Sequence, residues 1–331
     1  MNFRYIFLLL LISQNLYSGT VYIVHYAAGY TDAMLFNPNH HGGGLFFLAL
    51  RHAINKCGHQ CIMFPDNCQE IDSNAWFIAL ESPTKPQILN VLAQYPKDRS
   101  ILLMWEPPSV LPNNYNPALH IPFDKVFTLF HEMVDNKTYF PLYYPQSFLY
   151  MIKDIVPFNQ KKLCTMIVGE HTSIHPNELY THRRSIISFF ERMHPEEFDF
   201  YGNYWTNYNH PCYKGTVPDK IPYLRHYKFA ICYENMTSKT YLTEKIFDIL
   251  HAGCVPIYWG AQDITQLIPQ KAYILREDFG SDEELYHYLE TMPESEYQKY
   301  LAASIEFFYS TAAAKFSISW FVDSMIKALF E

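Results

Sequence analysis

Residues 227–260, YKFAICYENMTSKTYLTEKIFDILHAGCVPIYWG, contain the signals of a strand, a polar loop, a helix and a second strand in that order. The apolar run at 229–233 predicts a buried strand, and the run at 255–259 predicts the next one. Between them, residues 243–251 have the apolar spacing of a helix that Gly253 ends. Strands that alternate with helices are typical of a parallel sheet covered by helices. The segment therefore favours an α/β fold.

The same alternation extends over the rest of the chain and restarts once. Residues 141–157 are rich in Tyr and Pro and have no clear period, which is typical of a linker. We therefore expect two Rossmann-like domains facing a central cleft, the first at residues 20–150 and the second, with the terminal helices, at 151–331. One continuous doubly wound sheet is the alternative.

The individual elements follow from local patterns. In the first domain we expect strands at 21–25, 61–64, 76–80, 101–105 and 125–130 and helices at 86–94 and at 45–56, the latter capped by Gly58. In the second we expect further strands at 163–168 and 198–201 and helices at 178–193, 294–308 and 318–330. Another helix begins at the capping box that Ser281 forms with Glu284.

The first residues have the layout of a targeting segment. Arg4 is followed by the apolar block 5–12, and Ser18 and Gly19 supply small residues, as in a secretory signal peptide. The block is too short to cross a bilayer, which takes about 20 apolar residues. A buried first strand and a weak membrane-surface anchor are the alternatives. We expect residues 1–19 to be a signal peptide or short membrane anchor, and the protein to be in the secretory pathway or membrane-associated, in the Golgi if eukaryotic and at a membrane face if bacterial.

Composition argues against one class of partner. The 331 residues include 33 acidic and 25 basic side chains, a net charge of −8. Broad nucleic-acid binding needs a positive surface that displaces counterions from phosphates, so nucleic acid is not an expected partner. Hydrophobic residues make up 49% and charged residues 18% of the chain, as in a folded globular protein.

The seven cysteines do not form a metal-binding pattern. Cys57, Cys61 and Cys68 lie close together but lack a second pair at zinc-finger spacing. In a secreted chain, Cys57 could pair with Cys61 or Cys68, and sequence does not decide between them. Three other cysteines lie in apolar runs and are expected to be buried thiols: Cys164, Cys232 and Cys254.

Polar residues gather at both ends of the loop inside 227–260. The strand delivers Glu234 and Asn235 at its carboxyl end, the edge where open α/β sheets bind ligands. Thr243, Glu244 and Lys245 then open the helix, whose unpaired N–H groups and positive dipole end suit a diphosphate. The alternative is an ordinary N-cap and a solvated first turn. That alternative is favoured for an isolated T-E-K, but the surrounding strands and loop favour a ligand site.

Two other stretches carry candidate chemistry. Residues 178–202, ELYTHRRSIISFFERMHPEEFDFYG, predict an amphipathic helix with adjacent arginines, which are more often surface residues than ligand contacts. Residues 101–109, ILLMWEPPS, predict a strand that ends at Trp105 and Glu106, so Glu106 projects towards the cleft. Partial burial beside Trp and Pro raises the pKa of a carboxyl and makes it a better base near neutrality. A structural glutamate in a turn is an equally good interpretation of these residues.

The segment 227–260 closely resembles the donor-binding signature of the α-1,3/4-fucosyltransferases, glycosyltransferase family ten. The shared order is Y-E-N, a Tyr, T-E-K, A-G and V-P-I with a final Gly. The resemblance implies a metal-independent, inverting enzyme of GT-B fold that uses GDP-fucose. It also implies that Asn235, Tyr241 and Lys245 contact the diphosphate and that Glu244 contacts the ribose.

The same family resemblance extends to the other two stretches. An Arg that follows L-Y and reaches the donor phosphates falls on Arg183, with Arg184 as the alternative. The Glu of the family's E-x-P-S segment serves as general base and falls on Glu106. The implied reaction moves fucose from GDP-β-L-fucose to a glycan hydroxyl, expected at O3 of GlcNAc. A GT-B enzyme with another donor and an inactive glycan-binding relative are the alternatives.

Three further features of the sequence bear on cofactors and on the acceptor. No D-x-D motif occurs, so no metal ligand is assigned and no cofactor is expected to be required. The Gly-rich loop at 39–44, with His40 and His41, is not a phosphate-binding motif and is expected to shape the acceptor side of the cleft. Where the family continues with Trp or Ser-Tyr-Arg and an Asp, this chain has residues 129–132, LFHE, which bears on acceptor choice.

Overall fold

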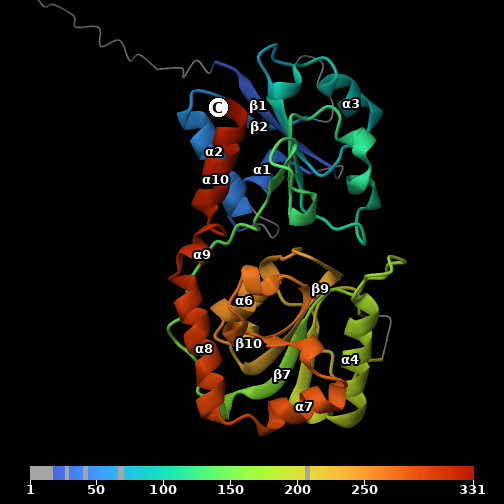
Figure 1. Cartoon of the computed structure of the whole chain (residues 1–331), viewed down its shortest axis with the longest axis vertical. Helices are drawn as coiled ribbons and strands as arrows, with labels where there is room; N and C mark the ends of the chain where they lie inside the picture. Colours follow the sequence, from blue (N-terminus) through green and yellow to red (C-terminus); the bar gives the residue numbers. More distant parts are fainter. Residues whose placement is uncertain (1–17, 27–29, 40–43, 66–70, 206–208) are drawn as a thin grey trace, which may run out of the picture.

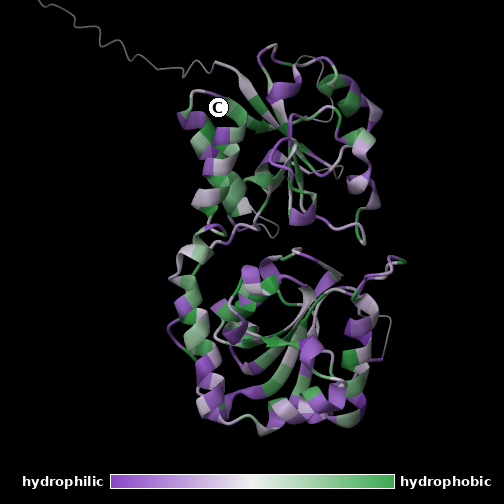
Figure 2. Ribbon diagram, viewed as in Figure 1, coloured by the Kyte–Doolittle hydropathy of each residue, from purple (hydrophilic) through white to green (hydrophobic). Residues whose placement is uncertain are grey.

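The protein has two α/β domains, which lie one above the other in Figure 1. The computed structural model describes residues 18–26, 30–39, 44–65, 71–205 and 209–331. Each domain is built on its own parallel sheet, so the two-domain prediction is confirmed and the single continuous sheet is excluded. Figure 2 shows hydrophobic residues on the strands and polar residues on the outer sides of the helices.

The first domain contains a six-stranded sheet with the order β2-β1-β3-β4-β5-β6. Its strands are β1 (Thr20–His25), β2 (Gln60–Met63), β3 (Trp76–Leu80), β4 (Ser100–Met104), β5 (Lys125–Thr128) and β6 (Tyr139–Pro141). Its helices are α1 (Asp32–Leu35), α2 (Gly44–Lys56) and α3 (Pro86–Leu92). In β1, Val21 and Ile23 lie in the same hydrophobic cluster as the buried residues of α2. Tyr22 and Val24 point to the other face of the sheet and lie in the same cluster as the buried residues of α3. Both faces are buried, which explains why the strands are continuous apolar runs.

The second domain contains a five-stranded sheet with the order β11-β10-β9-β7-β8. Its strands are β7 (Lys162–Ile167), β8 (Phe198–Tyr201), β9 (Tyr227–Ser238), β10 (Val255–Ala261) and β11 (Ile274–Leu275). Its helices are α4 (Tyr180–Met193), α5 (Ile221–Leu224), α6 (Glu244–His251), α7 (Asp282–Thr291), α8 (Glu294–Phe308) and α9 (Thr311–Ala314). Alternate residues of β9 lie in different hydrophobic clusters. Phe229 and Ile231 share a cluster with residues of α4, whereas Ala230 and Cys232 share one with residues of α6.

The last helix returns to the first domain. In α10 (Ile318–Phe330), Phe321 packs against Phe46 and Phe47 of α2 with ring centroids 5.3 and 6.3 Å apart. Lys125 of β5 donates to the carbonyl oxygen of Ala328 at 3.0 Å. The predicted division assigned all terminal helices to the second domain, whereas the structure packs α10 on the first, beside α2 in Figure 1. The physical reason is the apolar side of α10, which buries itself against α2.

Most predicted elements occur close to their predicted bounds. Gly58 and Gly253 follow α2 and α6 with φ of 85° and 66°, and Ser281 accepts the predicted capping bond from the Glu284 backbone N–H. The main difference is β9, which continues to Ser238 instead of ending at 233. β6, β11, α1, α5 and α9 were not predicted, because they are too short to show a period.

Several predictions concern the edges of the described chain. The expected targeting segment lies outside the described residues apart from Ser18 and Gly19. Among the described helices, none has both the length and the apolar character needed to cross a membrane. Cys57 and Cys61 are free thiols, so they do not pair with each other, and Cys68 lies outside the described residues. The three cysteines expected to be buried are buried: Cys164, Cys232 and Cys254.

Candidate active site

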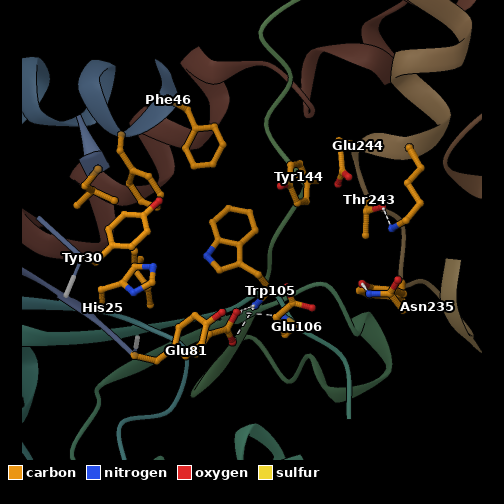
Figure 3. Close-up of a pocket in the computed structure, with 16 residues that line it drawn as sticks. His25, Tyr30, Phe46, Glu81, Trp105, Glu106, Tyr144, Asn235, Thr243 and Glu244 are labelled. Carbon is orange, nitrogen blue, oxygen red and sulfur yellow. Dashed lines mark hydrogen bonds between the residues drawn. The ribbon is translucent and has the colours of Figure 1, made fainter. Parts of the chain in front are cut away.

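A cavity of about 420 Å³ lies between the domains, where strands of both sheets end (Figure 3). Ligands of open α/β sheets bind at this carboxyl edge. The first domain contributes His25, Tyr26, Tyr30, Leu35, Phe46, Phe47, Leu80, Glu81, Trp105, Glu106 and Tyr144, and the second contributes Asn235, Tyr241, Thr243, Glu244 and Lys245. The structure therefore brings Glu106 and four of the five predicted donor residues to one cavity.

Glu234 organises the start of α6. Its side chain is fully buried and accepts hydrogen bonds from the Thr243 backbone N–H at 2.8 Å and from the Thr243 hydroxyl at 2.9 and 3.0 Å. Thr243 occupies the N-cap position, but its hydroxyl makes no capping bond to the helix. Thr243 is thus the N-cap residue, as the alternative interpretation had it, but its hydroxyl bonds Glu234 instead of the helix. The first N–H groups of α6 remain for an anion in the cavity.

Lys245 forms a buried ion pair with Glu234. Its Nζ lies 2.9 Å from the Glu234 carboxylate and donates to the Thr243 hydroxyl at 2.9 Å. Burial acts to lower the pKa of Lys245, but Glu234 and Glu244 outweigh burial and raise it, so the ammonium stays charged. An ammonium has three donors, and these two contacts leave one for a ligand oxygen.

Glu244 is the ionised carboxylate of the α6 first turn. Burial acts to raise the pKa of Glu244, but Lys245 and Lys220 oppose it and lower the pKa to about 2. Lys220 Nζ lies 3.6 Å from Glu244 and 2.7 Å from Asp248. Glu244 is thus held as an acceptor-only group at neutral pH. A carboxylate of this kind can accept hydrogen bonds from sugar hydroxyls.

Arg183 lies behind the cavity wall. Its side chain is 3% exposed, and Nη2 donates to the Tyr233 carbonyl oxygen at 2.7 Å and to Asn235 Oδ1 at 3.1 Å. Asn235 Nδ2 in turn donates to the Tyr241 hydroxyl at 3.4 Å. Arg184 instead bonds Glu170 at 3.1 Å, so Arg183 is the arginine that reaches the site. Arg183 contacts the cavity-lining residue Asn235, but its own side chain does not line the cavity.

Glu106 lies on the opposite side of the cavity. Figure 3 shows its carboxyl group pointing towards the side formed by Asn235 and the start of α6. Burial raises the pKa of Glu106; Lys245 lowers it, and Glu244 and Glu234 add to the increase. The group is a carboxyl of raised proton affinity on the side of the cavity opposite Lys245, and a raised proton affinity suits a general base.

Sequence reasoning missed one of the three glutamates that line the cavity, Glu81. It directly follows β3, so the rule that identified Glu106 at the end of β4 would also have found Glu81. Burial raises the pKa of Glu81 to about 8. The reasoning also missed the aromatic wall, in which His25 and Tyr30 stack with ring centroids 3.9 Å apart. Of the Gly-rich loop, residues 40–43 lie outside the described chain.

No metal site accompanies this cavity in the part of the chain that the structure describes. Within those residues, no group of three or more His, Cys, Asp or Glu side chains could hold a metal ion. The positive charge present at the cavity comes from Lys245 and from the amino-terminal end of α6.

Comparison with known proteins shows which proteins the chain resembles. Two facing parallel sheets with a cleft between them form a GT-B fold, and a solved alpha1,3-fucosyltransferase with GDP-fucose shares this fold. That structure has a TM-score of 0.55 at 17% identity and covers 95% of this chain and 90% of its own. Residues 159–316, slightly less than half of the chain, match the model of glycosyltransferase family 10 (fucosyltransferase), carboxyl-terminal region.

Curated relatives match over a shorter segment. An alpha-(1,4)-fucosyltransferase of Arabidopsis thaliana is 39% identical over 69 residues, 21% of this chain and 17% of that protein. The alpha-(1,3)-fucosyltransferase FucT of Helicobacter pylori is 34% identical over 73 residues, 22% of this chain and 15% of that protein. The aligned segments therefore span less than a fifth of these two relatives.

Proposed function

We propose that the protein transfers L-fucose from GDP-β-L-fucose to a hydroxyl group of a glycan, at O3 of GlcNAc. The observation that carries the proposal is the shared cavity, in which Glu106 from one domain faces Asn235, Glu244 and Lys245 from the other. The match to the family supports fucose as the sugar and GDP as the nucleotide. The matched relatives are named fucosyltransferases, and the solved fucosyltransferase of this fold contains GDP-fucose.

The donor is assigned to the second domain. The diphosphate binds at the amino-terminal end of α6, where backbone N–H groups and the Lys245 ammonium supply hydrogen bonds and positive charge. Asn235 and Tyr241 add polar contacts, and Arg183 fixes Asn235 from behind. Glu244 accepts hydrogen bonds from the ribose hydroxyls. These contacts stabilise the negative charge that builds on GDP as it leaves.

The chemistry is a single displacement with inversion. The acceptor oxygen forms a bond to the anomeric carbon of fucose while Glu106 removes the hydroxyl proton. The bond from that carbon to the phosphate oxygen breaks, and its electron pair leaves with GDP. The β-linked donor becomes an α-linked product. A positioned general base contributes about 10²- to 10⁴-fold to such a step. We expect no essential divalent metal, so turnover should persist in EDTA.

Release of GDP from GDP-fucose tests the proposal. Wild type should release GDP only when N-acetyllactosamine is present, and Glu106→Gln should lose turnover while GDP still binds. Parallel assays with GDP-mannose and a UDP-sugar test whether another donor is used. Binding of glycan without any turnover would instead indicate an inactive relative. Absence of GDP-fucose binding would refute the donor assignment.

A further inference from the structure

Glu81 adopts a backbone conformation that glutamate ordinarily avoids. Its φ is 68°, in the left-handed region, directly after β3. Glycine occupies this region without steric cost, whereas a residue with a Cβ is strained there. Its side chain is also a carboxyl that is only 3% exposed, and a buried polar group is costly unless it is hydrogen-bonded. Two unfavourable features at one position at the edge of the cavity point to a role for the side chain.

The Glu81 carboxyl group holds the backbone of the neighbouring strand end. Oε1 accepts hydrogen bonds from the backbone N–H of Trp105 at 3.1 Å and of Glu106 at 3.0 Å (Figure 3). Oε2 accepts a hydrogen bond from Asn114 Nδ2. The Glu106 carbonyl oxygen in turn accepts from Asn114 Nδ2 at 3.3 Å and from the Tyr115 hydroxyl at 3.2 Å. Both polar groups of the Glu106 backbone are therefore held by side chains.

The Glu106 side chain depends on this backbone for its orientation. No residue that the structure describes forms a hydrogen bond with the Glu106 carboxylate. A carboxylate without such partners is aimed only by its own backbone and by packing. The proline at 107 restricts Glu106 to extended conformations, but does not select one. The contacts from Glu81 supply the remaining restraint on the peptide between Trp105 and Glu106.

We propose that Glu81 is a positioning residue of the transfer reaction, which fixes the Trp105–Glu106 peptide so that the Glu106 carboxylate faces the donor. The inference rests on the proposed function, because it takes Glu106 as the general base. Glu81 does not touch the reacting atoms. It acts through the geometry of Glu106, and a displacement of about 1 Å at a catalytic group can reduce the rate by roughly 100-fold.

Two substitutions separate positioning from stability. Glu81→Gln keeps the shape but turns an acceptor into a donor opposite Asn114 Nδ2, which weakens the hold on the peptide. Glu81→Gly removes the hold and also relieves the left-handed strain and the buried carboxyl. Glu191→Gln is the matched control, because Glu191 accepts from the backbone N–H of Cys212 at 3.3 Å in the second domain and does not line the cavity.

The experiment measures kcat and KM with GDP-fucose and N-acetyllactosamine, GDP affinity by calorimetry, and the melting temperature. Both Glu81 variants should lose roughly 10- to 100-fold in kcat, with GDP affinity unchanged. Glu81→Gly should melt below wild type, because the N–H groups of Trp105 and Glu106 and the Asn114 amide lose their acceptor. The control Glu191→Gln should keep wild-type kcat. A purely structural role predicts a lower melting temperature and unchanged kcat per folded molecule.

The outcomes distinguish this inference from the proposed function. Wild-type kcat in Glu81→Gln, together with a strong loss in Glu106→Gln, would overturn the role of Glu81 alone. Wild-type kcat in Glu106→Gln would refute the general base and overturn both. Loss of GDP affinity in the Glu81 variants would also contradict the inference, because it would mean that Glu81 supports the donor side of the cavity.

Discussion

Replacing Lys245 by Met should destabilise the protein and weaken GDP binding, and the two effects should be separable. The Lys245 ammonium lies 2.9 Å from a Glu234 carboxylate that is 0% exposed. At an effective dielectric constant of about 20, the Coulomb energy at that distance is on the order of 6 kcal/mol. Desolvation offsets part of this energy, and breaking a buried pair by removing one partner typically costs about 3–5 kcal/mol.

The double variant Glu234→Gln/Lys245→Met removes the uncompensated charge. It should recover most of the lost stability, because a neutral amide can still accept a hydrogen bond from Thr243. In both Lys245→Met and the double variant, GDP affinity should stay roughly 10- to 100-fold below that of wild type. The reason is that a hydrogen bond from a charged donor is worth about 1.5–3 kcal/mol. Stability is read from urea denaturation and affinity from calorimetry.

The surface pair Lys299 and Glu296 provides the control. Its atoms lie 2.6 Å apart, but the side chains are 73% and 41% exposed, so Lys299→Met should change stability little. Wild-type stability in Lys245→Met would refute the buried ion pair. Recovery of GDP affinity in the double variant would refute the role of Lys245 in donor binding.

Three further predictions concern Glu106, Glu81 and Phe321. The kcat/KM of wild type should rise with pH as Glu106 ionises, at a pH above the range of an ordinary glutamate because burial raises its pKa, and this rise should vanish in Glu106→Gln; a pH-independent wild type would argue against the base. Glu81 has a folded pKa of about 8 against 4.5 when exposed, so wild type should lose stability relative to Glu81→Gln as pH rises from about 5 to 8, and urea denaturation showing a constant difference would contradict the raised pKa. Phe321 of α10 is 2% exposed and packs on α2, so Phe321→Ala should lower the free energy of unfolding by about 3–5 kcal/mol. A melting temperature near that of wild type would show that packing of α10 does not stabilise the first domain.

Local signals were sufficient for much of the fold and part of the site. The position of Glu106 at the cavity was predictable because Glu106 follows an apolar strand and precedes a proline. The position of Lys245 was predictable because Lys245 opens a helix after another strand. Both signals lie within a few residues. The period of the apolar runs likewise predicted the strands of both sheets, because all but the shortest elements are long enough to show it.

Features that depend on contacts distant in sequence were not predictable in this way. The packing of Phe321 on Phe46 joins residues from opposite ends of the chain. The Thr243 hydroxyl looked like a helix cap until the fold placed the Glu234 carboxylate 2.9 Å away. The left-handed backbone of Glu81 has no local signal, because glutamate is not a residue that ordinarily marks such a conformation.

Only the burial of Arg183, and not its contacts, was predictable from the sequence. An amphipathic helix predicts which side is buried, and Arg183 and Arg184 lie on different sides of α4. The pattern alone does not say what a buried guanidinium contacts. The structure shows that Arg183 bonds the Asn235 side chain and the Tyr233 carbonyl oxygen, so its contact with the cavity passes through Asn235.

The most direct test of the account is the structure of the reaction product. The protein is incubated with GDP-β-L-fucose and N-acetyllactosamine, and the anomeric configuration and linkage of any product are determined by NMR. The account predicts an α-linked fucose on O3 of GlcNAc and release of one GDP for each fucose transferred. A β-linked product would contradict the inverting displacement by Glu106, and consumption of another nucleotide sugar in place of GDP-fucose would contradict the donor assignment.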